Sequence, residues 1–121
     1  MSTLVVDAAN VIGSVPDGWW KDRPGAAVRL HSHLLAGTLP YDAIVLVLEG
    51  RARAGVPAGA SGTVHTVHAP GSGDDEIVDQ VCRLSEQGEQ VTVATADRGL
   101  LARLAPFNAG TLAPRQLHPA G

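Results

Sequence analysis

Short apolar segments that each stop at a polar residue recur along this chain of 121 residues. Two of them are unbroken: residues 4–6 lead directly into Asp7, and residues 43–48 lead into Glu49. Segments this short and this rich in branched aliphatic side chains are typical of strands buried on both faces of a sheet. We therefore predict two buried strands, each of which carries a carboxylate at its carboxyl end.

Three further strands are predicted from weaker patterns. Residues 63–69 (TVHTVHA) form one of them, and residues 90–94 (QVTVA) form the next, which runs into Thr95 and Asp97. Residues 110–117 are expected to add a short edge strand. Pro114 limits its length, because proline cannot donate a hydrogen bond to the strand ladder.

Three helices are predicted between these strands. The first begins at Pro24, since proline is favoured at the first helical position, and it ends at Gly37. The other two cover residues 74–87 and 98–107. The apolar positions expected to face the core are Val28, Leu30, Leu34 and Leu35 in the first helix, Ile77, Val78, Val81, Cys82 and Leu84 in the second, and Leu100, Leu101 and Leu104 in the third.

Two connections have distinctive compositions. Residues 14–23 form a loop by their Pro and Gly content and contain Trp19 and Trp20. A tryptophan that covers the edge of the core is favoured here over a base-stacking surface beside a cation. Residues 51–62, rich in Ala and Gly, are predicted to form a mobile loop that carries two arginines.

Strands that alternate with helices predict a parallel sheet with right-handed crossovers and helices on both faces. The expected fold class is α/β: a three-layer α/β/α domain with a four- to five-stranded, mainly parallel sheet. The length fits one domain over residues 1–121. The C-terminus is expected to be frayed from about residue 118.

Composition narrows the class of protein. Apolar residues make up 45% of the chain and charged residues 17%, which is typical of a globular domain. The single cysteine, Cys82, cannot form an internal disulfide and fits a reducing compartment. The N-terminal apolar run is too short for a signal peptide, and no segment approaches a membrane-spanning length. We therefore expect a cytoplasmic protein with no membrane partner.

The formal net charge of −3 argues against a protein that holds nucleic acid by overall positive charge. It does not exclude an enzyme whose local acids are neutralised by bound cations.

Acidic residues follow the predicted strands at the ends where parallel strands share an edge. Asp7 and Glu49 end the first two strands, Asp74 and Asp75 open the helix after the third, and Asp97 follows the fourth. In open parallel sheets the ligand crevice lies outside the carboxyl ends of the strands. The sequence therefore predicts that distant segments bring several carboxylates into one crevice.

Such crowding is unfavourable without a positive charge, because each like pair at about 4 Å costs roughly 4 kcal/mol near a protein surface. Either some carboxylates are protonated or a divalent cation is bound. Oxygen ligands without imidazole or thiolate favour Mg²⁺ or Mn²⁺ over zinc. These cations support hydrolysis of phosphodiesters by an activated water.

Each acid also has a structural explanation. Asp74 and Asp75 lie in a first helical turn, where the helix dipole favours carboxylates, and Asp97 is placed to cap the next helix. Glu49 is explained equally well as a solvated strand end. Asp7 is the hardest to explain structurally, because no helix is expected to begin directly after it. The shared edge, rather than any single acid, carries the prediction.

Other chemistries find less support. The chain lacks a glycine-rich loop ending in Lys-Ser/Thr, the phosphate-binding loop of common NTPases. Ser72 and Cys82 have no base at motif spacing, so a nucleophile triad is unsupported. Ala9 replaces the second aspartate that haloacid-type phosphatases require after Asp7.

Three motifs, in this order, resemble the NYN branch of the PIN-like nuclease superfamily. They are residues 5–10 (VVDAAN), 73–77 (GDDEI) and 93–99 (VATADRG). The resemblance covers nearly the whole chain. It implies a four- or five-stranded parallel sheet, a divalent-metal site and endoribonuclease activity.

By position, the resemblance implies that Asp7, Asp74 and Asp97 are metal-coordinating catalytic acids. Asn10 would orient the loop or a substrate phosphate, and Thr95 would help to place Asp97.

The remaining predicted site residues have supporting roles. Asp75 and Glu49 are expected to support the metal, and Glu49 matches its position less securely. Arg98, Arg51 and Arg53 are candidate phosphate contacts because they neighbour the acidic edge.

The leading hypothesis is a Mg²⁺- or Mn²⁺-dependent endoribonuclease that cleaves RNA, single-stranded or structured, with metal-activated water. The alternative is a non-catalytic module that keeps the PIN-like fold and binds RNA or a protein. A metal-dependent phosphatase is a weaker third candidate. Small domains of this family often pair, so a homodimer is a further expectation.

Overall fold

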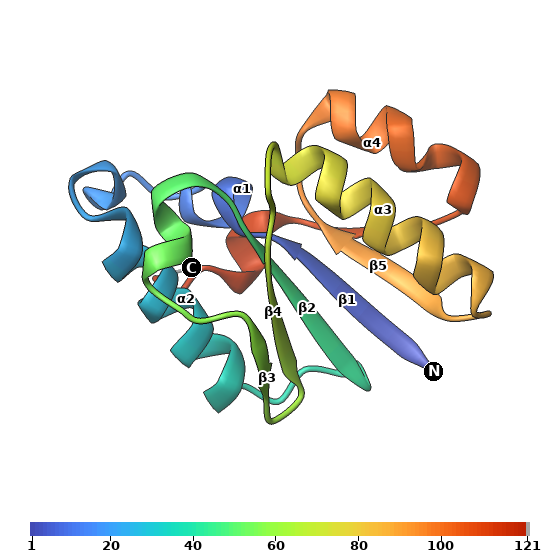
Figure 1. Ribbon diagram of the computed structural model, residues 1–121, viewed down its shortest axis with the longest axis horizontal. Helices are drawn as coiled ribbons and strands as arrows, with labels where there is room; N and C mark the ends of the chain where they lie inside the picture. Colours follow the sequence, from blue (N-terminus) through green and yellow to red (C-terminus); the bar gives the residue numbers. More distant parts are fainter. Residues whose placement is uncertain (121) are drawn as a thin grey trace.

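A six-stranded sheet lies between two layers of helices in the computed structural model, which describes residues 1–120 (Figure 1). The strand order is β3-β4-β2-β1-β5-β6. The strands are β1 (Ser2–Asp7), β2 (Ala43–Leu48), β3 (Gly59–Ser61), β4 (Val64–His68), β5 (Gln90–Ala94) and β6 (Gly110–Leu112). All neighbours pair in parallel except β3 and β4, which are antiparallel. The predicted three-layer α/β/α class is confirmed, with one strand more than expected.

Four α-helices and four 3₁₀ turns connect the strands of the described residues. The α-helices are α1 (Ala8–Ile12), α2 (Arg23–Ala36), α3 (Gly73–Glu86) and α4 (Arg98–Leu104). The 3₁₀ turns are η1 (Trp19–Lys21), η2 (Gly50–Ala54), η3 (Ala105–Phe107) and η4 (Pro114–Leu117). Across residues 1–120, no helix combines the length and the apolar character that crossing a membrane requires.

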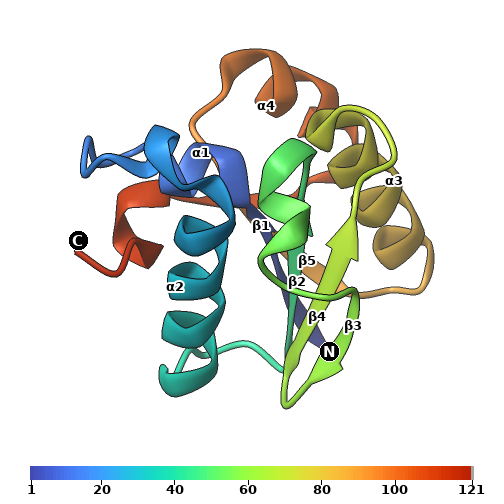
Figure 2. The ribbon, with the colours of Figure 1, turned by 60° about the vertical axis from the view of Figure 1, so that its left-hand side comes forward.

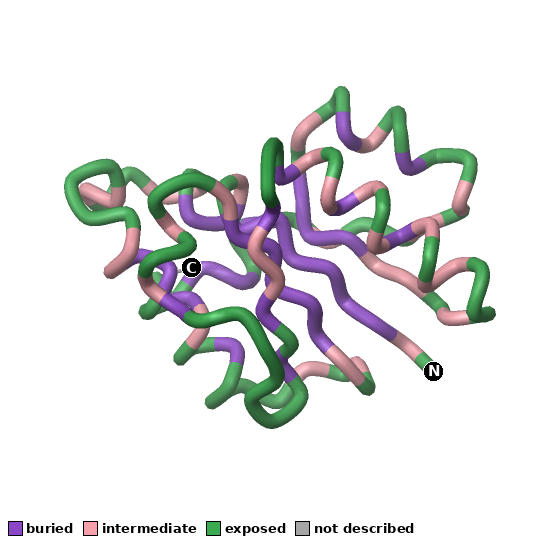
Figure 3. The backbone as a smooth tube through the Cα atoms, in the orientation of Figure 1, coloured by how far each residue is buried: buried purple, intermediate pink, exposed green. Residues whose placement is uncertain are grey.

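The two faces of the sheet are covered by different helix pairs. Helices α1 and α2 pack on one face, and α3 and α4 pack on the other (Figures 1 and 2). Strand β1 contributes to both cores, since Leu4 and Val6 face the first pair of helices and Val5 faces the second. All three are fully buried, so the continuous apolar run of the sequence is the mark of a central strand. Figure 3 shows the buried strands at the centre of the molecule.

The apolar stripe predicted for the first helix is partly wrong. Leu30 and Leu34 are buried, but Val28 and Leu35 are 44% and 42% exposed. The helix instead packs through small residues, because Ala26 and Ala27 are buried beside the leucines.

Cys82 is likewise only partly buried, on the flank of α3. Its thiol lies 3.6 Å from the Glu86 carboxylate, one turn later. The predicted inward position of this cysteine is therefore wrong.

The stretch predicted as a mobile loop, residues 51–62, contains most of η2 and all of β3. Every residue of β3 is exposed, so this edge strand has no apolar pattern from which it could be predicted. The turn η2 packs on the start of α2, where Gly55 approaches the Pro24 carbonyl so closely that a Cβ would collide with it.

The end of the described chain packs against other parts of the molecule. Strand β6 and η4 occupy the region expected to hold a short edge strand. His118 is 4% exposed, and its Nε2 lies 3.5 Å from a carboxylate oxygen of Asp17. His118 is thus packed against the loop that holds Asp17, while fraying from about residue 118 stays a prediction, and residue 121 lies outside the described residues.

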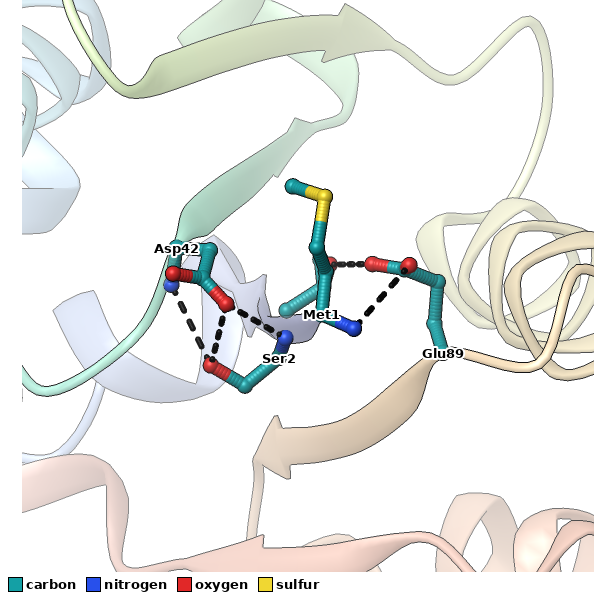
Figure 4. A network of polar contacts seen from close by, with 5 residues as sticks. Met1, Ser2, Asp42 and Glu89 are labelled. Carbon is teal, nitrogen blue, oxygen red and sulfur yellow. Dashed lines mark hydrogen bonds and ion pairs between the residues drawn. The ribbon is translucent and has the colours of Figure 1, made fainter.

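A polar network closes the amino-terminal edge of the sheet (Figure 4). The backbone N–H of Ser2 donates to Asp42 Oδ2 over 2.8 Å, and the Ser2 hydroxyl lies 3.2 Å from the same oxygen. Thr3 Oγ1 donates to Glu89 Oε1 over 2.8 Å, and the N-terminal ammonium lies 3.7 Å from Glu89 Oε2. The acids at this edge are thus matched with donors of β1.

Candidate active site

Four acids gather at the opposite, carboxyl edge of the sheet. Asp7 ends β1, Glu49 follows β2, Asp74 lies in the first turn of α3, and Asp97 precedes α4. The negative charges of Asp74 and Glu49 raise the pKa of Asp7, and those of Asp97 and Glu49 raise the pKa of Asp74. The carboxylates are therefore close enough to repel one another, as the parallel topology predicts.

Asp7 is 5% exposed and has two hydrogen-bond donors. Its Oδ1 accepts from the backbone N–H of Asn10 over 3.3 Å, and its Oδ2 accepts from the Thr95 hydroxyl over 2.9 Å. The first of these bonds makes Asp7 the N-cap of α1. The expectation that no helix begins directly after Asp7 is therefore wrong. One turn of helix is too short to be recognised from an apolar period.

The pKa of Asp7 is raised from 3.8 to about 6, and the largest cause is burial, which penalises the charged carboxylate. The hydrogen bonds from Thr95 and Asn10 act in the opposite direction, and the charges of Asp74 and Glu49 add to the rise. A carboxyl group buried at this edge is thus poised to change its charge within an ordinary range of pH.

Asn10 and Thr95 tie the end of β1 to the segment that follows β5. The side-chain oxygen of Asn10 accepts from the backbone N–H of Ala96 over 2.9 Å. Thr95 is 3% exposed, and its hydroxyl also accepts from the backbone N–H of Asp97 over 3.2 Å while it donates to Asp7. This bond from the Asp97 N–H supports the predicted role of Thr95 in placing Asp97, which stays a prediction.

Glu49 is held by the first residue of α3. Its Oε2 accepts from the backbone N–H of Gly73 over 2.9 Å. A Cβ on Gly73 would lie 3.1 Å from the Glu49 carboxylate, so the absence of a side chain there leaves room for this approach. The contact joins the end of β2 to the helix that carries Asp74.

Asp74 is partly buried, and its pKa is raised chiefly by that burial and then by the charge of Asp97. Arg103 of α4 acts against the rise. The guanidinium of Arg103 lies 2.9 Å from Asp75, whose side chain is 71% exposed. Asp75 is therefore occupied by a cation of this chain, and its support of a metal stays a prediction.

Asp97 has a structural role as well. Its Oδ1 accepts from the backbone N–H of Leu100 over 3.0 Å and caps α4. This is the capping role that the sequence offered as the structural explanation of this acid. The same side chain still contributes its charge to the edge that holds Asp74.

The three predicted phosphate contacts differ from one another. Arg53 donates to the carbonyl oxygens of Gly50, over 3.0 Å, and Ala69, over 3.3 Å, so it fixes the chain beside β4. Arg51 and Arg98 are exposed. These two have side chains in solvent near the acidic edge, where a phosphate could approach.

A cavity of about 450 Å³ adjoins the acidic edge. Its lining includes Trp19, Arg23 and Glu49, together with Ala9 of α1 and Gly71, which precedes α3. Trp19 also packs against the core, as the sequence favours.

Two arginines near the acidic edge are missing from the predicted site. Arg23 has a sequence signal, because it follows two tryptophans and a lysine within four residues. Arg103 has none, because its meeting with Asp75 depends on how α3 and α4 pack together.

The donor chemistry of the acidic edge suits a hard cation, since all four groups are carboxylates. Within residues 1–120, however, no three His, Cys, Asp or Glu side chains form a group that could hold an ion directly. Mg²⁺ usually keeps several waters and binds through one or two carboxylates and substrate phosphates. The residues present fit this binding through one or two carboxylates, waters and substrate phosphates, rather than direct binding by three side chains.

No protein-family model matches the sequence, and no curated protein matches it significantly. Among solved structures, a mutant of Rae1 (YacP) from Bacillus subtilis is similar, with a TM-score of 0.61 and 17% sequence identity. The alignment covers 97% of this chain and 72% of that chain. The fold is PIN-like. At this identity the likeness concerns the fold alone, and the activity must be argued from the site.

Proposed function

We propose that the chain is a divalent-metal-dependent endoribonuclease. The observation that carries the proposal is the placement of Asp7, Glu49, Asp74 and Asp97 at the carboxyl edge of one sheet, where Asp74 lies close enough to the other three for their charges to act on one another. An edge that concentrates negative charge is unfavourable for the protein alone and favourable for a cation. The three sequence motifs that resemble NYN ribonucleases contain three of these four acids.

Asp7, Asp74 and Asp97 are the residues that would hold Mg²⁺ or Mn²⁺, one or two of them directly and the rest through waters on the ion, with Glu49 in support. The cation would activate a water for attack and offset the charge that develops on the phosphodiester. The hydrogen bonds of Thr95 and Asn10 hold Asp7 and the loop before α4 in a fixed position relative to one another. Arg51 and Arg98 are the exposed cations available to the substrate backbone.

The decisive experiment is cleavage of a labelled single-stranded RNA by the wild type and by Asp7→Asn, with Mn²⁺ and with EDTA. Asn keeps the size of the side chain and, through its oxygen, the capping of α1, but it removes the charge and the second oxygen, which accepts from Thr95. We expect metal-dependent cleavage by the wild type and a loss of at least about 100-fold in the variant, the scale of losing one group that acts in the transition state.

The matched control is Asp79→Asn, which removes an exposed acid from the middle of α3. It should cleave at the wild-type rate. Cleavage by Asp7→Asn as fast as by the control would refute the assignment.

The second candidate is a binding module that keeps the fold without catalysis. It is favoured by the lack, within the described residues, of three side chains that could hold an ion directly. Calorimetric titration with Mn²⁺ separates the two candidates, because the module needs no cation at this edge. Heat of binding that disappears in Asp7→Asn supports the nuclease, and no heat with the wild type supports the module.

A further inference from the structure

The cavity of about 450 Å³ beside the acidic edge has the size of a small-molecule site. It lies between segments that also carry the acids: Ala9 follows Asp7 by two residues, and Gly71 precedes Asp74 by three. Glu49 belongs to both, because it lines the cavity and binds the first residue of α3. A molecule in this cavity would therefore be a direct neighbour of one bound at the acids.

The walls of the cavity combine an aromatic ring with a guanidinium. Trp19 is half-buried, and the Arg23 guanidinium lies 5.3 Å from the centre of its ring. The guanidinium therefore covers one face of the ring, and aromatic rings and guanidinium planes are surfaces on which nucleobases stack in protein–RNA complexes. Arg23 is the single cation among the described residues that line the cavity. The chemistry of these walls matches a flat, polar-edged, π-rich group.

Trp20 provides an internal comparison. It is 51% exposed and meets Trp19 edge-on, with the ring centres 5.7 Å apart, but it is not among the residues that line the cavity. The aromatic pair therefore presents one ring to the cavity and the other to solvent.

We propose that this cavity receives one unpaired base of the RNA, packed against the Trp19–Arg23 pair, next to the phosphodiester at the acidic edge. This inference rests on the proposed function and deepens it, because it assigns a subsite for a base beside the acids. A base in the cavity is out of reach of a complementary strand, so a duplex would have to open to bind. Sequence-tolerant stacking of this kind is typical of single-stranded nucleic acid sites.

The test measures binding separately from cleavage. Fluorescence anisotropy of a labelled eight-nucleotide RNA is recorded with the Asp7→Asn protein in Mg²⁺, so that the strand stays intact. Trp19→Leu in this background should weaken binding by about 5- to 150-fold, the effect of losing one stacked base. Trp20→Leu, the matched control, should change it by less than about twofold.

A second variant guards against a folding defect in Trp19→Leu. Gly71 lines the cavity, and a Cβ built on it meets nothing within 4 Å, so Gly71→Leu is expected to add bulk at the cavity wall. It should weaken binding as Trp19→Leu does, and circular dichroism should show that both variants are folded. The same RNA annealed to its complement should bind more weakly than the single strand.

Equal effects of Trp19→Leu and Trp20→Leu, an unaffected Gly71→Leu, or equal affinity for the duplex would each overturn the inference, as would no RNA binding. These results are distinct from failure of the proposed function, which is read from cleavage by the wild type. A protein that binds RNA through Trp19 but never cleaves it would keep this inference and refute the nuclease.

Discussion

At the scale of single residues, two aspartates at opposite edges of the sheet behave in opposite ways. The N–H and hydroxyl groups of Ser2 lower the pKa of Asp42, which is exposed. Burial raises the pKa of Asp7 to about 6, although Thr95 and Asn10 donate to it. The surroundings of Asp42 stabilise its charged form, whereas the charged form of Asp7 lowers the free energy of unfolding.

The destabilising charge of Asp7 predicts that, in the absence of metal, Asp7→Asn is more stable than the wild type by an amount that depends on pH. Between pH 3.8 and about 6 the native state holds a proton that the unfolded state has released, so wild-type stability falls as pH rises through this window. The full penalty, about 3 kcal/mol at about 1.4 kcal/mol per pKa unit, is present above pH 6. Asparagine has no charge and avoids this penalty, although its amide nitrogen cannot accept the hydrogen bond from Thr95, a loss of about 1 kcal/mol.

Urea unfolding in EDTA should therefore show Asp7→Asn to be more stable than the wild type by about 1–3 kcal/mol at pH 8. The difference should shrink to zero or below at pH 4. Asp42→Asn should behave oppositely, since it removes a charge that its hydrogen bonds favour. A stability difference for Asp7→Asn that is the same at pH 4 and pH 8 would show that the charge of Asp7 is not the cause.

At the scale of elements, the apolar pattern of the sequence predicts the buried strands and helices but not the exposed or very short ones. Strands β1, β2 and β5 lie close to their predicted bounds because their side chains are buried on one or both faces. Strand β3 is exposed throughout and carries no such signal. Helix α1 is a single capped turn, which an apolar period of 3.6 residues cannot reveal.

The contact between β2 and α3 depends on a residue without a side chain. Gly73→Ala would place a Cβ 3.1 Å from the Glu49 carboxylate, which must then move by a few tenths of an ångström and weaken its bond to the Gly73 N–H. We expect a loss of about 1 kcal/mol in the free energy of unfolding, the value of one such hydrogen bond. Urea unfolding measures it.

Gly71→Ala is the matched control for Gly73→Ala, because a Cβ on Gly71 meets nothing within 4 Å. It should be neutral or slightly stabilising, as expected where alanine restricts only the unfolded chain. If the two variants are equally stable, then the approach of Glu49 to α3 does not depend on glycine.

At the scale of the whole molecule, the parallel topology explains why the clustering of the acids could be predicted, while their role in a site stays a prediction. The rule that parallel strands share a carboxyl edge was enough to bring Asp7, Asp74 and Asp97 together from segments up to 90 residues apart. The rule does not extend to side chains that meet through packing. Arg103 contacts Asp75, and Trp19 lines the same cavity as Glu49, only because of how helices and turns are placed around the sheet.

The same topology makes the charge of the molecule asymmetric. At the amino edge, Asp42 and Glu89 are matched by donors of Ser2 and Thr3 and by the terminal ammonium (Figure 4). At the carboxyl edge, the positive charge of Arg103 lowers the pKa of Asp74, but Arg103 itself pairs with Asp75. A divalent cation should therefore stabilise the protein through the carboxyl edge alone.

Thermal unfolding with increasing Mn²⁺ tests this asymmetry. A ligand of the native state at 100 times its Kd adds about 2.7 kcal/mol, so the Tm of a domain of this size should rise by roughly 5–15 °C. The rise should be larger at pH 8 than at pH 5, because Asp7 must lose its proton to bind a cation, and Asp74→Asn should reduce it. Asp42→Asn alters an acid of the other edge and should leave the rise intact. A rise that survives Asp74→Asn but not Asp42→Asn would place the cation at the amino edge. The crowding of carboxylates at the carboxyl edge would then be relieved by protonation alone, without a bound cation.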